Sequence, residues 1–185
     1  MKAKKVKELM IPLSDYATVP DTDTLAGAIQ ILKQVNADRQ MNHKHRAVLV
    51  YDAEDHHVIG KVGIREILKA MEPKYRQFAG TDHPGNVSLS HFGFNQEFLS
   101  SLVDKYSLWH ESMEALVAKA ANIPIREIMY TPSRGEYVNI DAPVSEAVHQ
   151  FIIGCHQSLL VVEKKRVKGI LRLADVFDMV CDLMA

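Results

Sequence analysis

Nine histidines are the residues of this chain best suited to acid–base catalysis or metal binding. His43 and His45 lie in one polar connection, and His56 and His57 lie in a second that could approach the first. No carboxylate or thiol completes a metal-ligand pattern of known spacing, and the common nucleophile, phosphate-loop and zinc-protease motifs are absent from the sequence. We therefore expect neither an enzyme nor a metal site.

Composition narrows the classes of partner. The formal net charge of −1 and a pI near 6.8 provide no overall field that would attract nucleic acid or anionic membrane. No apolar run approaches the ~18 residues of a membrane span. Cys155 and Cys181 are far apart and form no C-x-x-C pair, which is typical of buried thiols in a reducing compartment. We expect a cytoplasmic protein with no nucleic acid and no membrane among its partners.

The sequence contains one pattern twice. The run Val6–Met10 returns 119 positions later as Ile125–Met129. On the same offset, Val19, Leu25, Ala28 and Ile29 return as Val138, Val144, Ala147 and Val148. Such self-similarity indicates two copies of one unit, each too small to bury its own apolar face. The copies should pack on each other, with the function between them.

Each copy has the periodicity of a strand, a helix, two further strands and a second helix. The expected strands cover 17–19, 47–50 and 58–62 in the first copy, and 137–140, 159–162 and 167–171 in the second. The expected helices cover 25–35 and 66–71, then 144–152 and 176–184, with Thr22 or Asp23 as the cap of the first. The strand residues expected to meet between the copies are Val48, Val50, Ile59 and Val62, with Leu160, Val162, Ile170 and Leu171.

The two copies are separated by a segment that has no counterpart in the repeated pattern. Gly80 to Gly85 interrupts it, and two helical faces follow, at 99–106 and 109–120. We expect a helical insertion packed against the repeats. The chain then divides into a first motif at 4–72, an insertion at 73–122 and a second motif at 123–185.

The repeated elements resemble a known family. The run V-x-E-[LI]-M, the helix with its A-[IV] pair, and the Gly-bearing strand with an acid six positions after the Gly are similar to the CBS domain, named for cystathionine beta-synthase. The resemblance covers 4–70 and 123–184. It implies an α+β fold in which tandem CBS motifs pack by pseudo-two-fold symmetry, a Bateman module. Its clefts would bind adenine nucleotides or related adenosyl ligands.

The family pattern G-h-x-[ST]-x-x-[DN] supplies a hydroxyl to phosphate and an acid to the ribose hydroxyls. Here Gly63 and Arg172 replace the hydroxyl residue, Asp175 keeps the acid and Glu66 is a longer acid. The resemblance thus implies a ligand site drawn from Asp175, Arg172, Glu66 and Gly63, with the strand backbone of Tyr137, Val138 and Asn139 directed toward the base.

Each of these side chains has a second interpretation. Arg172 is either a forked contact to a di- or triphosphate or a surface arginine at a strand end. Asp175 is either a ribose ligand or a carboxylate that accepts the free N–H groups of a helix start. For Glu66 we favour the role of a first-turn helix stabiliser.

Two functions remain open. We favour a stand-alone regulatory module that binds AMP, ADP, ATP or S-adenosylmethionine between the copies and acts on a separate, unknown protein. The alternative is a ligand-free interaction module that uses the helical insertion as its contact surface. The apolar helices at 66–71 and 175–184 also predict a homodimer.

Overall fold

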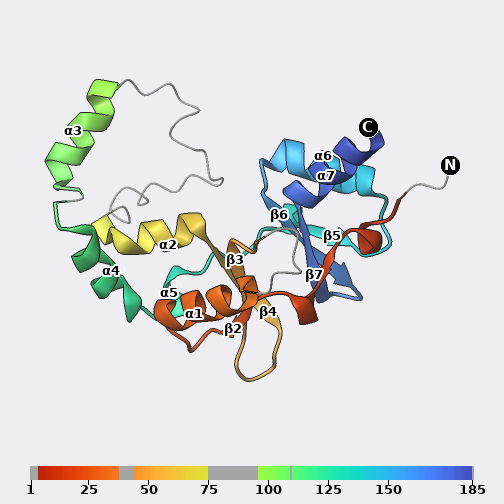
Figure 1. Cartoon of the computed structure of the whole chain (residues 1–185), viewed down its shortest axis with the longest axis horizontal. Coiled ribbons are helices and arrows are strands. Elements are labelled where there is room, and N and C mark those ends of the chain that lie inside the picture. The colour runs from red at the N-terminus through yellow and green to blue at the C-terminus, as the bar shows by residue number, and fades with distance from the viewer. Residues whose placement is uncertain (1–3, 38–43, 75–95, 109, 185) are drawn as a thin grey trace.

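Two small sheets, each covered by helices, form the core of the computed structural model, which describes residues 4–37, 44–74, 96–108 and 110–184 (Figure 1). The sheet of the first copy has the order β2 (Thr18–Pro20), β3 (Ala47–Tyr51), β4 (Val58–Gly63). The sheet of the second copy has the order β1 (Ile11–Pro12), β7 (Arg166–Arg172), β6 (Ser158–Glu163), β5 (Tyr137–Asn139). The predicted α+β architecture with tandem repeats is confirmed.

The helices follow the predicted order. They are α1 (Leu25–Asn36) and α2 (Ile64–Met71) in the first copy, α3 (Gln96–Tyr106) and α4 (Met113–Ala121) between the copies, and α5 (Ile125–Ile128), α6 (Val144–Gly154) and α7 (Leu173–Met184) in the second. The predicted cap of α1 was wrong. Thr24 is the N-cap, and its hydroxyl accepts the Gly27 N–H at 3.3 Å, while the Asp23 carboxylate accepts the Thr24 N–H.

The strand registers show that the two copies are built alike. In each copy the first strand is parallel to the second, and the second and third form an antiparallel hairpin. Val48 pairs with Val62 as Leu159 pairs with Leu171, and each hairpin has a register shift near its turn. Residues of the two copies can therefore be matched one to one along these hairpins.

The leading segments of the two copies are exchanged. Val6 belongs to the core of the second copy, and β1 pairs with β7 through Ile11 and Ile170. Reciprocally, Ile125 is buried in the core of the first copy, and Tyr130 exchanges two backbone hydrogen bonds with Lys61. Each copy's core is therefore completed by residues from the other copy's sequence.

The exchange explains the glycine of each repeat. A Cβ atom on Gly169 would lie 2.2 Å from the Ile11 carbonyl oxygen, and one on Gly60 would lie 2.7 Å from the Met129 sulfur. The exchanged segment thus passes directly over each glycine. A larger residue at Gly169 would push the Ile11 backbone away from the sheet, whereas at Gly60 the Met129 side chain would have to move first, with the Tyr130 carbonyl oxygen at 3.1 Å.

The two sheets meet through a small apolar cluster of Tyr16, Leu49, Leu160 and Ile170. The predicted meeting of the sheets is right for Leu160 and Ile170. It was wrong for Val48, Val50, Ile59, Val62 and Leu171, which pack in the two cores formed by each copy's helices and the exchanged segments. Val162 belongs to none of the apolar clusters of the described residues. Successive strand residues point to opposite faces of a sheet, so Leu49, between Val48 and Val50, is the residue that faces the other copy.

Within the insertion, α4 packs against the first copy. Leu116 and Ala120 of α4 are buried, and Ala120 joins Leu25 and Ala70 in one cluster. Figure 1 shows α3 apart from both sheets. The predicted break at 80–85 and Trp109 lie outside the described residues. None of the helices described is long and apolar enough to cross a membrane.

Candidate ligand-binding site

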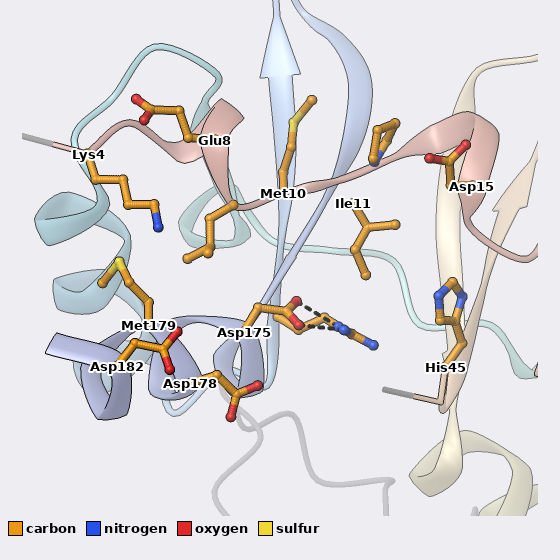
Figure 2. A pocket seen from close by; sticks show the side chains of 13 residues that line it. Lys4, Glu8, Met10, Ile11, Asp15, His45, Asp175, Asp178, Met179 and Asp182 are labelled. Carbon is orange, nitrogen blue, oxygen red and sulfur yellow. Dashed lines mark hydrogen bonds and ion pairs between the residues drawn. The ribbon is translucent and has the colours of Figure 1, made fainter. Parts of the chain in front are cut away.

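A pocket of about 450 Å³ lies where the end of β7 and the start of α7 meet the leading segment of the first copy (Figure 2). Arg172, Asp175 and Met179 come from the second copy. Met10, Ile11 and His45 come from the first. A ligand in this pocket would contact both copies, which is where the repeat predicts the function.

Arg172 and Asp175 form a forked ion pair at the pocket. Arg172 is the last residue of β7, and Asp175 lies in the first turn of α7. The Arg172 Nε donates to Asp175 Oδ2 at 2.7 Å, a terminal guanidinium nitrogen donates to Oδ1, and both side chains are largely buried. Arg172 is therefore not a free surface arginine. A carboxylate has about four acceptor sites, so Asp175 retains capacity for hydroxyl donors.

His45 forms part of the pocket wall and was not among the predicted site residues. Its imidazole stacks on the Tyr16 ring with centroids 4.2 Å apart. The Asn36 side chain holds the His45 backbone from both sides, accepting its N–H at 2.7 Å and donating to its carbonyl at 2.8 Å. The residue is only 2% exposed. It is thus fixed in place before any ligand binds.

Neither ring nitrogen of His45 has a hydrogen-bond partner among the described residues. Burial lowers the pKa of His45, the nearby Arg172 charge lowers it further, and Asp175 opposes the shift. The ring is therefore a neutral imidazole, with one N–H donor and one acceptor unused. One signal in the sequence could have pointed to this residue. When the two hairpins are aligned by their registers, His45 and His156 occupy equivalent positions, each two residues before the first paired residue of its hairpin.

The other predicted residues lie elsewhere. The Glu66 carboxylate accepts the Gly63 N–H at 2.9 Å and so stabilises the start of α2, the role we favoured. Tyr137, Val138 and Asn139 form β5, at the edge of the four-stranded sheet opposite β1. They do not line the pocket at Asp175. Of the predicted set, the structure brings only Arg172 and Asp175 together there.

A buried ion pair joins the third strand of the first copy to the start of the second copy's first strand. Lys61 takes the register position that Ile170 has in the second copy, and its Nζ lies 2.7 Å from Glu136 Oε2. The Tyr130 hydroxyl and the Ser133 N–H also donate to Glu136, which is 2% exposed. Burial raises the pKa of Glu136, but these hydrogen bonds and the Lys61 charge outweigh it and lower the pKa overall. The two copies therefore differ in chemistry where their folds agree.

Comparisons with known proteins identify the fold. The model of the CBS domain family matches residues 6–73 and 123–182. CBSX2 from Arabidopsis thaliana is 15% identical, with 99% of this chain and 98% of that chain covered and a TM-score of 0.60. CBSX2 is also known in complex with AMP, at 14% identity, 98% coverage of both chains and a TM-score of 0.57.

Two further structures are similar. A putative acetoin utilization protein, AcuB, from Vibrio cholerae is 18% identical, with 99% and 94% of the chains covered and a TM-score of 0.59. Protein MJ1004 from M. jannaschii is 20% identical with a TM-score of 0.57, and the match covers 97% of this chain but 60% of that one. No curated protein sequence matches the chain. With two family matches that together cover more than half of its residues, the chain belongs to the CBS domain family.

Proposed function

We propose that this protein is a regulatory CBS-pair module that binds an adenine nucleotide or a related adenosyl ligand in the pocket at Asp175. The observation that carries the proposal is the position of Asp175, held by Arg172 at the edge of a pocket that both copies line. A carboxylate fixed in this way suits two neighbouring hydroxyl groups, such as those of ribose. The AMP complex of CBSX2, which has the same fold, supports the ligand class.

Ligand binding in this pocket would be coupled to the packing of the two copies. A ligand would contact Asp175 and the exchanged residue Ile11, which both belong structurally to the second copy, and His45 from the body of the first. Its binding free energy therefore depends on how the copies are placed, and by linkage the ligand biases that placement. A separate partner protein that prefers one placement would then respond to the ligand. The existence of such a partner protein is also part of the proposal.

We also propose that the module is a homodimer. Large apolar side chains are exposed on α2, α6 and α7, namely Ile64, Leu68, Ile152, Ile153, Phe177 and Leu183. Large apolar side chains exposed on helices are typical of an interface between subunits. Sedimentation velocity should show a dimer at micromolar concentration, and Phe177→Asp should shift it toward monomer. A monomer for the unmutated chain would contradict the proposal.

A thermal-shift screen against adenosine, AMP, ADP, ATP and S-adenosylmethionine tests the ligand. A ligand at 100 times its Kd stabilises the folded state by about 2.7 kcal/mol. Asp175→Ala should reduce the shift, because Asp175 would supply two charge-assisted hydrogen bonds worth about 1.5–3 kcal/mol each. Glu66→Ala is the matched control, since Glu66 holds the equivalent helix start in the other copy. If no compound shifts the melting temperature, the interaction-module alternative replaces this proposal.

A further inference from the structure

The two exchanged segments are attached by equivalent backbone hydrogen bonds. Residues 4–12 are the first leading segment, and residues 123–131 are the second leading segment. Val6 of the first donates its N–H to the Ala142 carbonyl at 2.9 Å, and Ile125 of the second donates its N–H to the Asp23 carbonyl at 2.8 Å. Both donors and both acceptors are related by the same offset of 119 positions as the repeat. The attachments of the two segments can therefore be compared one by one.

The ion pairs that hold the two segments differ in burial. In the first leading segment, Lys5 and Lys7 pair with Asp141 at 3.2 and 2.9 Å, and all three side chains are between 41% and 55% exposed. Solvent screens such pairs, so they hold the segment weakly. In the second leading segment, Arg126 pairs at 2.8 Å with Asp21, which is 5% exposed. Detaching the second segment would leave this buried carboxylate without its cation, which is costly.

The strand contacts differ in the same direction. The first leading segment pairs with β7 through Ile11 and Pro12, and proline has no N–H to donate to the sheet. In the second leading segment, Tyr130 takes the position of Ile11 and exchanges backbone hydrogen bonds of 2.8 and 3.0 Å with Lys61. The Tyr130 hydroxyl also donates to the buried Glu136. The first leading segment is therefore the more weakly attached of the two.

The pocket lies beside the more weakly attached segment. Figure 2 shows the first leading segment along one side of the pocket and α7 along another. Leu9, Met10 and Ile11 are partly exposed and line the pocket together with Asp175 and Met179. If the segment detached, the pocket would lose this side and a ligand would lose its contacts there. A ligand therefore binds the attached form more tightly and, by linkage, stabilises the attachment.

We infer that the first leading segment is the element that responds to the ligand: a ligand bound at Asp175 fastens residues 4–12 to the second copy, whereas the second leading segment stays attached with or without ligand. The inference rests on the proposed function. It locates the response to the ligand in one short segment of the exchange.

Limited digestion with trypsin, followed by mass spectrometry, tests the inference. The Lys7–Glu8 and Arg126–Glu127 bonds lie at equivalent positions of the two segments, and glutamate follows the cleavage site in both. Without ligand, cleavage after Lys7 should be faster than cleavage after Arg126 by about tenfold or more, because the first leading segment opens more easily. With adenosine or AMP at 100 times its Kd, cleavage after Lys7 should slow by up to about 100-fold. Cleavage after Arg126 should change by less than about threefold.

Calorimetry on the same samples separates the inference from the proposed function. A compound that binds but leaves cleavage after Lys7 unchanged, or that protects Arg126 to the same extent, would overturn the inference and leave the proposed function intact. Equal cleavage rates at the two bonds without ligand would also overturn the inference. If neither adenosine nor AMP binds, both fail.

A variant tests the weak anchor of the first leading segment directly. Asp141→Asn removes the partner of Lys5 and Lys7 and should speed cleavage after Lys7 by about threefold, while cleavage after Arg126 stays the same. Saturating ligand should restore the protection. Glu111→Gln is the matched control, because it removes an exposed ion pair that lies outside both leading segments, and it should change neither rate. An unchanged rate after Lys7 in Asp141→Asn would contradict the role of these ion pairs.

Discussion

Replacing Lys61 with methionine should destabilise the protein strongly. The Glu136 carboxylate is 2% exposed and the Lys61 side chain 15% exposed, and their charged atoms lie 2.7 Å apart. Methionine matches the length of the lysine stem, so packing is largely kept while Glu136 loses its cation. Breaking a buried pair by removing one partner costs about 3–5 kcal/mol. Because Tyr130 and Ser133 still donate to Glu136, we expect the lower end, about 3 kcal/mol.

Urea unfolding followed by circular dichroism measures this loss, and a double-mutant cycle isolates the pair. Lys61→Met/Glu136→Gln should recover part of the stability, because the double variant buries no uncompensated charge. Lys119→Met is the matched control. Lys119 pairs with Glu111 at 2.5 Å, but both side chains are exposed, so its loss should cost at most about 1 kcal/mol. A cost for Lys61→Met no larger than that of Lys119→Met would refute the reasoning.

The remaining predictions concern the exchanged segment and the pH dependence of stability. Gly169→Ala should lower the free energy of unfolding in urea by about 1–3 kcal/mol, because the added Cβ would be overpacked against the Ile11 backbone. Gly135→Ala is the control and should cost little, because its Cβ would lie 3.8 Å from the nearest atom, the His156 Nε2. Equal effects of the two substitutions would argue against the close crossing. Burial lowers the pKa of His45 from 6.5. As the pH falls, His45 is therefore protonated in the unfolded chain before it is protonated in the folded protein. The contribution of His45 to the free energy of unfolding is thus complete above about pH 6.5 and decreases below it. Melting temperatures measured between about pH 7.5 and 5.5 should therefore fall less for His45→Phe than for the unmutated chain, and parallel profiles would contradict the shift.

The sequence predicted the repeat, the element order and the helical insertion, because each depends on local periodicity. It could not predict which sheet face meets the other copy. Residues 48–50 are apolar without alternation, since β3 is buried on both faces, so Leu49 could not be distinguished from Val48 and Val50. The exchange of the leading segments leaves no local signal either. Nothing near Val6 indicates that its core is the one around Val138 and Phe151.

The candidate site was predictable only in part. Arg172 and Asp175 are three residues apart across a strand end and a helix start, so their proximity follows from local geometry. His45 reaches them only through the packing of one copy on the other. The pairing of Lys61 with Glu136 joins residues 75 positions apart and likewise depends on tertiary structure.

Two-dimensional NMR of the labelled protein, titrated with adenosine, tests the central claim that an adenosyl ligand binds between the copies at Asp175. We predict that the backbone amides of Arg172 to Asp175, of Met10 and Ile11, and of His45 shift together and saturate with a single Kd. The amides of Gly63 to Glu66 should move little, because that strand end lies outside the pocket. Shifts confined to Gly63–Glu66 and its surroundings, or no shift at millimolar adenosine, would contradict the claim.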